Sequence, residues 1–164
     1  MSLKIRVGFL GLLLSAGLAR AGDFNAEVDF VTRASTANLV AVAESRLALN
    51  RTRNPKVRAF ARRLVEDHGS AAVALQVAAN GSGAKAATTL DRDDQRRVAV
   101  LQGKSGANFD KAYVADQLAV HSNVLTFYAD YMLLGDNEKL KALAIKMIPI
   151  AQAQLKDAQA LEGD

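Results

Sequence analysis

Hydrophobic residues recur along most of the chain at intervals of three and four, the spacing of one face of an α-helix. Turn residues interrupt this pattern and predict helices at residues 24–50, 55–80, 91–102, 107–134 and from 136 or 137 to the C-terminus. Asn54 and Pro55 are typical of an N-cap and the first position of a helix. Almost no segment alternates with the period of two of a half-buried strand. We therefore expect an all-α four-helix bundle, with one short extra helix in the crossover.

Each long helix carries an apolar stripe that we expect to face the core of the bundle. In helix order the stripes run through Phe24, Val28, Val31, Val42 and Leu49; through Val57, Ala61, Leu64, Ala71, Leu75 and Ala78; through Val114, Leu118, Leu125, Tyr128 and Met132; and through Leu140, Ala144, Met147, Ala151, Ala158 and Leu161. Pro149 lies inside the last predicted helix. Because proline removes one backbone donor, it predicts a kink near Ile145.

The first residues have the order of a secretory signal peptide. Lys4 and Arg6 precede an apolar run over residues 7–18, and Ala19 and Ala21 then form a small-residue cleavage site. We expect cleavage after Ala21, which leaves residues 22–164 as the helical-bundle domain in the periplasm or outside the cell. The apolar run is about a dozen residues long, whereas a membrane-spanning helix needs roughly 20. An uncleaved anchor is therefore the lesser alternative, and we do not expect the mature form to be transmembrane.

The charge balance argues against a nucleic-acid partner. The chain has 21 basic and 17 acidic residues, and residues 1–21 hold three of the basic ones and none of the acidic ones, so cleavage leaves 18 against 17. A basic run over residues 51–63 is followed by Glu66 and Asp67, and we interpret it as a solvated helix face. The chain has no cysteine. This excludes disulfides, cysteine-type zinc sites and thiol chemistry.

Polar residues interrupt the apolar stripes. The chain has two histidines, and each falls within a stripe: His68 on the second helix and His121 on the third long helix. Further polar residues at or beside the stripes are Gln154 on the last helix and Asn38, Glu44 and Ser45 on the first. Two interpretations stay open. One is a metal or cofactor site, because imidazole is a common metal ligand and bundle cores hold such sites. The other is a hydrogen-bonded pair that fixes helix register.

A ferritin-type di-iron motif is absent. Such a motif places a glutamate three residues before a histidine on two helices, but those positions hold Val65 and Leu118. No serine lies in a nucleophile-elbow context, so we assign no catalytic residue. If the chain binds a transition metal, the candidate ligands are His68, His121, Asp67, Gln154 and Glu44.

The motifs resemble a bacterial family of exported, ferritin-like helical bundles described only as a domain of unknown function, DUF4142. The matching segments are Phe30-Val31, residues 54–61 leading to Asp67-His68, residues 109–113 leading to His121, and Ile148-Pro149. The resemblance implies that typical members carry a third histidine at the place of Gln154 and a glutamate at the place of Ala41. Glu44, one turn further along the same helix, can substitute for that glutamate. Because both typical ligands are replaced, the resemblance implies that this member binds a metal weakly or not at all.

We therefore expect a non-enzymatic periplasmic helical-bundle protein that acts through binding or in envelope stress tolerance. This expectation rests on compartment and family analogy. The alternative is a ferritin-like metal-binding or redox protein that uses a buried layer around His68 and His121. A third possibility is a lipid- or partner-binding bundle that uses the alanine-rich second helix as a close-packing surface.

Overall fold

The structure is a computed structural model that describes residues 25–163. Its helices are α1 (Ala26–Arg51), α2 (Pro55–Ala78), α3 (Arg92–Gln102), α4 (Gly106–Leu134) and α5 (Glu138–Glu162). The starts of all five, and the ends of the first four, lie within two residues of the predicted bounds, and the described range contains no strand. The predicted signal peptide at residues 1–21 and the stripe residue Phe24 lie outside the described residues.

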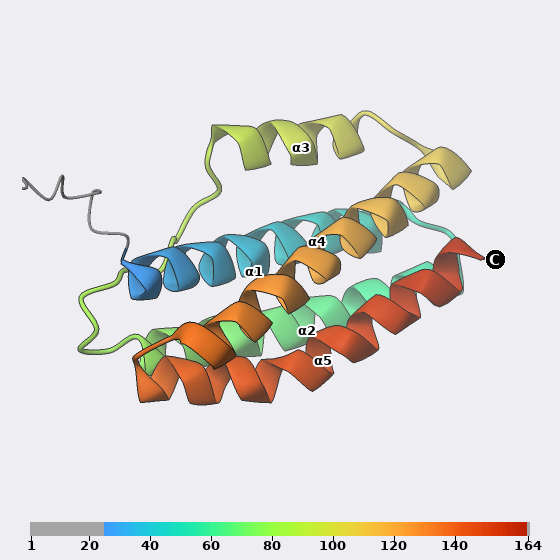
Figure 1. The fold of residues 1–164 in the computed structure, drawn as a ribbon. Helices are drawn as coiled ribbons and strands as arrows, with labels where there is room; N and C mark the ends of the chain where they lie inside the picture. Colours follow the sequence, from blue (N-terminus) through green and yellow to red (C-terminus); the bar gives the residue numbers. More distant parts are fainter. Residues whose placement is uncertain (1–24, 164) are drawn as a thin grey trace, which may run out of the picture.

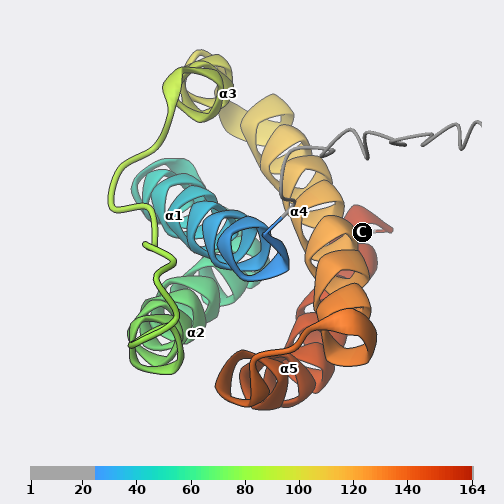
Figure 2. The same ribbon diagram turned by 60° about the vertical axis from the view of Figure 1, so that its left-hand side comes forward.

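The four long helices form a bundle in which each packs against two neighbours. α1 contacts α2 and α4, and α5 contacts the same two helices from the opposite side. Neighbouring helices run antiparallel (Figure 1). α3 lies outside the bundle against α1 and α4, where it carries the chain from the end of α2 to the start of α4 (Figure 2). The predicted all-α four-helix bundle with a short crossover helix is confirmed.

Local capping fixes where the helices begin. The Oδ1 atom of Asn54 accepts hydrogen bonds from the backbone N–H groups of Lys56 and Val57 at 2.9 and 3.4 Å, and Pro55 occupies the first turn as predicted. Side-chain caps of the same kind occur at Asn25, Asp91 and Asn137. Each cap satisfies N–H groups that the first turn of a helix leaves without a backbone partner.

The buried face of α1 differs from the predicted stripe. Val28 is 42% exposed and Val42 is only partly buried, so the prediction was wrong at these two positions. Val31 is buried, and the partly buried Leu49 packs against an apolar core, as predicted. The buried residues of α1 are Phe30, Val31, Ala34, Ser35, Asn38, Val40, Ala41, Glu44, Ser45 and Ala48. Most of them are small or polar. Such a face is hardly more hydrophobic than the exposed face of the same helix, and the pattern of apolar residues therefore did not identify it.

The other stripes agree better with the structure. The predicted residues of α2 and α5 are buried except for the partly buried Ala78 and Leu161 at the helix ends. On α4 the buried face is wider than predicted, because the helix packs against three others. It adds Phe109, Tyr113, Gln117, Val120, Val124, Phe127 and Tyr131, whereas Leu118, Leu125 and Met132 are only partly buried.

Pro149 lies inside α5, as predicted. The helix changes direction partway along its length (Figure 1). A proline in a helix interior removes one backbone hydrogen bond and crowds the preceding turn, which accounts for the bend.

The bundle contains two apolar cores. The larger core packs residues from the start of α1, the end of α2, the end of α4 and the start of α5, among them Phe30, Leu75, Phe127, Tyr131 and Leu140. The smaller core packs residues from the opposite ends of the same helices, among them Leu64, Phe109, Tyr113 and Ala158, together with Leu101 of α3. Each long helix therefore passes through both cores.

Truncation inside the smaller core should destabilise the protein. Leu64 is fully buried, and we expect Leu64→Ala to lower the free energy of unfolding by about 2 to 5 kcal/mol, through lost burial and the cavity left behind. Val77 on the same helix is 69% exposed, so Val77→Ala should cost no more than about 0.5 kcal/mol. Urea unfolding followed by circular dichroism measures both values. Equal costs would contradict the core assignment.

Candidate functional site

A layer of polar side chains lies between the two apolar cores. On α2, His68 lies between Leu64 of the smaller core and Ala71 of the larger core. The buried members of this polar layer are Asn38, Glu44 and Ser45 of α1, His68 of α2, Gln117 and His121 of α4, and Gln154 of α5, and the partly buried Asp67 joins them at the edge. All four long helices therefore contribute to it.

The two histidines meet within the polar layer. The Nε2 atoms of His68 and His121 are 3.3 Å apart. The Nδ1 atom of His68 is 2.9 Å from Asn38 Oδ1, and the Nδ1 atom of His121 is 2.7 Å from the backbone carbonyl oxygen of Gln117, one turn earlier on α4. Both rings are buried, with 4% and 0% exposure. Each imidazole thus faces an oxygen on one side and the other imidazole on the opposite side.

Gln154 and Asp67 adjoin the histidine pair. The Nε2 group of Gln154 donates a hydrogen bond to Asp67 Oδ2 at 3.0 Å. The Gln154 side chain also acts to raise the pKa of His121, against the larger effect of burial. Gln154 is buried, whereas Asp67 is partly exposed. The amide therefore links the edge of the bundle to its centre.

Glu44 belongs to a different part of the polar layer. Its Oε2 atom accepts a hydrogen bond of 2.6 Å from Gln117 Nε2, and its Oε1 atom is 2.9 Å from Arg97 Nε of α3. Arg97 also donates to the backbone carbonyl of Asp116 at 3.1 Å. The Glu44 side chain is completely buried, and burial raises its pKa to about 7 although Arg97 acts in the opposite direction. These contacts make Glu44 one of the points where α3 is attached to the bundle.

Burial also keeps both imidazoles neutral. It lowers the pKa of His68 to about 3, and the neighbouring His121 lowers it further. The pKa of His121 is lowered by burial, against the opposing effect of its hydrogen bonds to Gln117 and Gln154. A charged imidazole in this position would lose its hydration without gaining an anionic partner. The pair is therefore uncharged at neutral pH.

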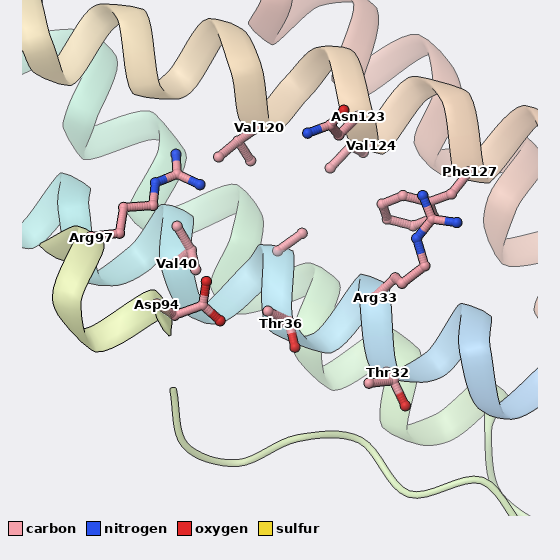
Figure 3. Close-up of a pocket in the computed structure, with 11 residues that line it drawn as sticks. Thr32, Arg33, Thr36, Val40, Asp94, Arg97, Val120, Asn123, Val124 and Phe127 are labelled. Carbon is pink, nitrogen blue, oxygen red and sulfur yellow. The ribbon is translucent and has the colours of Figure 1, made fainter. Parts of the chain in front are cut away.

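A groove of about 400 Å³ lies where α3 faces α1 and α4 (Figure 3). Arg97 and Arg33 line its two ends, and Val40, Val120 and Val124 line the part between them. Arg33 is already engaged, because its guanidinium lies over the ring of Phe127 and pairs with Asp29. The two histidines and Gln154 do not line this groove. The groove therefore borders the Glu44 end of the polar layer.

The structure brings together four of the five candidate ligands from the sequence. His68 and His121 contact each other, and Gln154 joins them to Asp67. Glu44 is bound by Gln117 and Arg97 instead. Sequence reasoning missed these two partners. Gln117 left a usable signal, since it lies four residues before His121 and thus on the same side of the helix, whereas nothing in the sequence indicated that Arg97 of the crossover helix reaches Glu44.

Two further features of the described residues bear on the function. Within residues 25–163, no three His, Cys, Asp or Glu side chains gather in a way that could hold a metal ion. None of the helices described has the length and apolar character needed to span a membrane.

The polar layer should make stability depend on pH in two opposing ways. An unfolded histidine takes up a proton below about pH 6.5, whereas the buried pair stays neutral, so its contribution is present above pH 6.5 and is lost as the pH falls toward 3. Glu44 acts in reverse. In the folded state Glu44 keeps its proton up to about pH 7, whereas in the unfolded state it loses the proton above about pH 4.5. Its contribution to the stability of the fold is therefore lost as the pH rises from about 4.5 to about 7.

We expect the two histidines to outweigh Glu44, because each group contributes at most about 1.4 kcal/mol per pH unit. With chelator present, the wild type should be less stable at pH 5 than at pH 7.5. The double variant His68→Leu, His121→Leu should lose this decline. It should be more stable at pH 5 than at pH 7.5, because the effect of Glu44 remains. Urea unfolding at both pH values tests this. The same pH dependence in both proteins would contradict the neutral buried pair.

Comparison with known proteins supports the fold and assigns a family. A crystal structure of a DUF305 fragment from Deinococcus radiodurans is similar to this chain, with a TM-score of 0.72 and 14% identity, covering 84% of this chain and 95% of that one. At this identity the likeness concerns the fold alone. No curated protein matches the sequence. The model of the family described as a domain of unknown function, DUF4142, matches residues 15–161, and the chain therefore belongs to the DUF4142 family.

Proposed function

We propose that this protein is an exported, non-enzymatic helical-bundle protein that binds a transition-metal ion between His68 and His121. One observation carries the proposal. The two Nε2 atoms face each other at 3.3 Å, while the other nitrogen of each ring faces an oxygen.

The positions of the ring protons follow from these neighbours. A neutral imidazole carries one proton, and a carbonyl oxygen only accepts hydrogen bonds. Asn38 Oδ1 and the Gln117 carbonyl therefore hold the protons on the two Nδ1 atoms. In this tautomer both Nε2 atoms carry lone pairs, which a cation bound between them would use. A donated Nδ1–H group is the usual way in which metal-binding histidines are oriented.

A metal ion suits the polar layer better than a shared proton. Burial lowers the pKa of both imidazoles, so a proton is unfavourable there at neutral pH. The neutral imidazole is the form that coordinates metals.

The surroundings favour holding an ion over redox chemistry. Oxygen-rich di-iron centres use several carboxylates, but here both oxygens of Glu44 are engaged by Gln117 and Arg97, and Asp67 accepts from Gln154. The histidines are almost inaccessible to solvent, which does not suit the turnover of a substrate. Envelope stress tolerance through capture of metal ions fits this site, and that role rests on the predicted export and on family analogy.

Zinc binding tests the proposal directly. Isothermal titration of the chain lacking residues 1–21 should give one Zn²⁺ per chain. The single variants His68→Leu and His121→Leu should lose this binding, because each removes one of the two imidazoles. Glu66→Leu, which removes an exposed acid two residues before His68, is the matched control and should bind as the wild type does. If wild type and histidine variants titrate alike, the histidines form a hydrogen-bonded pair that fixes helix register and the proposal is wrong.

Export has its own test. N-terminal sequencing of the protein recovered from the periplasm should begin at or near Gly22, because Ala19 and Ala21 suit the small-residue pockets of a signal peptidase. An Ala19→Arg, Ala21→Arg variant should remain unprocessed. Recovery of exported wild type that still begins at Met1 or Ser2 would show that the segment is not cleaved.

A further inference from the structure

Basic side chains gather at one end of the bundle, away from the histidine pair. Residues 45–65 contain no acid and seven basic residues, all of them exposed: Arg46, Arg51, Arg53, Lys56, Arg58, Arg62 and Arg63. They lie on the end of α1, on the turn that follows it and on the first turns of α2. At this end of the bundle α4 begins and α5 finishes (Figure 1). The near balance of charge over residues 22–164 therefore conceals a local excess of positive charge.

Hydrogen bonds connect the basic run across neighbouring segments. Arg58 of α2 donates to the backbone carbonyl oxygens of Leu49 and Thr52, at the end of α1, at 2.7 and 2.6 Å. Arg51 of α1 donates to the backbone carbonyl oxygen of Lys104, in the turn before α4, at 3.1 Å. The seven basic residues and the exposed Lys104 therefore form one band, which we call the basic end.

The bonds of Arg51 and Arg58 hold their guanidinium groups in place without neutralising them. A carbonyl oxygen accepts a hydrogen bond but carries no net charge, so both groups keep their positive charge. Each group also has N–H donors that these bonds do not use. Cations fixed in position bind an anion at a smaller cost in side-chain entropy than mobile ones do.

Three further arginines have no structural role that the fold accounts for. Arg58 satisfies carbonyl groups at the C-terminal end of α1, where a cation is favourable. Arg63 pairs with Asp157 of α5. Arg46, Arg53 and Arg62, in contrast, form no ion pair or hydrogen bond with any of the residues that the structure describes. Their charges are free to act on a partner.

The basic end suits an extended anionic partner that needs neither stacking nor insertion. Its side chains are spread over several segments, which fits an array of negative charges better than one small anion. Phe60, the aromatic residue of the run, is 4% exposed, so it offers no face on which a nucleic-acid base can stack. The strongly exposed large apolar side chains of the described residues all lie outside residues 45–65. A layer of lipid phosphates attracts cations without either kind of contact.

We propose that the basic end docks the protein reversibly on a membrane surface that contains anionic phospholipids. Each Lys or Arg near such a surface strengthens binding about 5-fold, and salt screens this attraction. Several cations on one end of the bundle therefore give substantial binding, with no segment inserted into the bilayer. The choice of lipid over another polyanion rests on the proposed export, whereas the docking itself does not depend on metal binding.

Cosedimentation with vesicles tests the proposal. The chain lacking residues 1–21, with chelator present, should bind phosphatidylcholine vesicles that contain about 30% phosphatidylglycerol at about 50 mM NaCl and should dissociate at about 500 mM NaCl. It should not bind vesicles of phosphatidylcholine alone. Inorganic phosphate at equal ionic strength should not displace it, because the partner is an array of charges.

Charge variants locate the surface. The triple variant Arg46→Gln, Arg53→Gln, Arg62→Gln should bind the anionic vesicles about 100-fold more weakly, at about 5-fold for each charge. The matched control, Lys85→Gln, Lys139→Gln, Lys146→Gln, removes three exposed cations outside the basic end and should bind as the wild type does. If circular dichroism shows that the triple variant does not fold, Arg53→Glu replaces it. That residue lies in the turn between α1 and α2, and reversing its charge should weaken binding about 25-fold.

The remaining outcomes would overturn the proposal. Equal binding to neutral and anionic vesicles would show that charge does not drive docking. Equal binding by the wild type and the triple variant, or equal losses in the triple variant and its control, would show that the basic end is not the surface. Displacement by inorganic phosphate would indicate a site for a small anion, and binding of single-stranded DNA without binding of vesicles would indicate a different polyanion. None of these results changes the zinc titration or the N-terminal sequencing, so the proposed function is tested separately.

Discussion

The buried contact between His68 and His121 constrains the rest of the bundle. Imidazoles cannot lie in an apolar core without partners, because an unpaired polar group there costs several kcal/mol. Asn38 of α1 and the Gln117 carbonyl of α4 supply those partners. Each of these contacts fixes the position of one helix along the bundle axis. A shift of any long helix by one turn would separate a donor from its acceptor, whereas the apolar cores on either side tolerate many arrangements.

The Glu44 contacts show how the same constraint extends to the crossover helix. α3 buries only one residue, Leu101, so its attachment depends heavily on Arg97 reaching Glu44 and the carbonyl of Asp116. Burial works against the charge of Glu44, and the guanidinium restores part of the lost stability. Gln117 connects the two regions, because its side chain binds Glu44 while its backbone carbonyl binds His121. One residue of α4 therefore holds α3 and the histidine pair in a fixed relation.

The ligands offered by this polar layer differ from those of carboxylate-bridged bundles. Here both oxygens of Glu44 are engaged by Gln117 and Arg97, and the groups that meet at the centre are two neutral imidazoles. Neutral ligands do not offset the charge of an iron pair, which is why the proposed ligand is a single ion. The proposed role in ion capture follows from this difference in ligand charge.

Helix positions and most of the core could be predicted from the sequence, because capping residues such as Asn54 and periodic apolar residues such as those of α2 act locally. The two histidines could also be assigned to the interior, since each lies within an apolar stripe. The buried face of α1 could not be predicted from the sequence, because its Ala, Ser and Asn residues are also common on exposed helix faces. The tertiary structure alone decided that Gln154 binds Asp67 and that Arg97 pairs with Glu44. These two contacts join residues 87 and 53 positions apart, and their geometry depends on the relative rotation and level of packed helices, which no local pattern encodes.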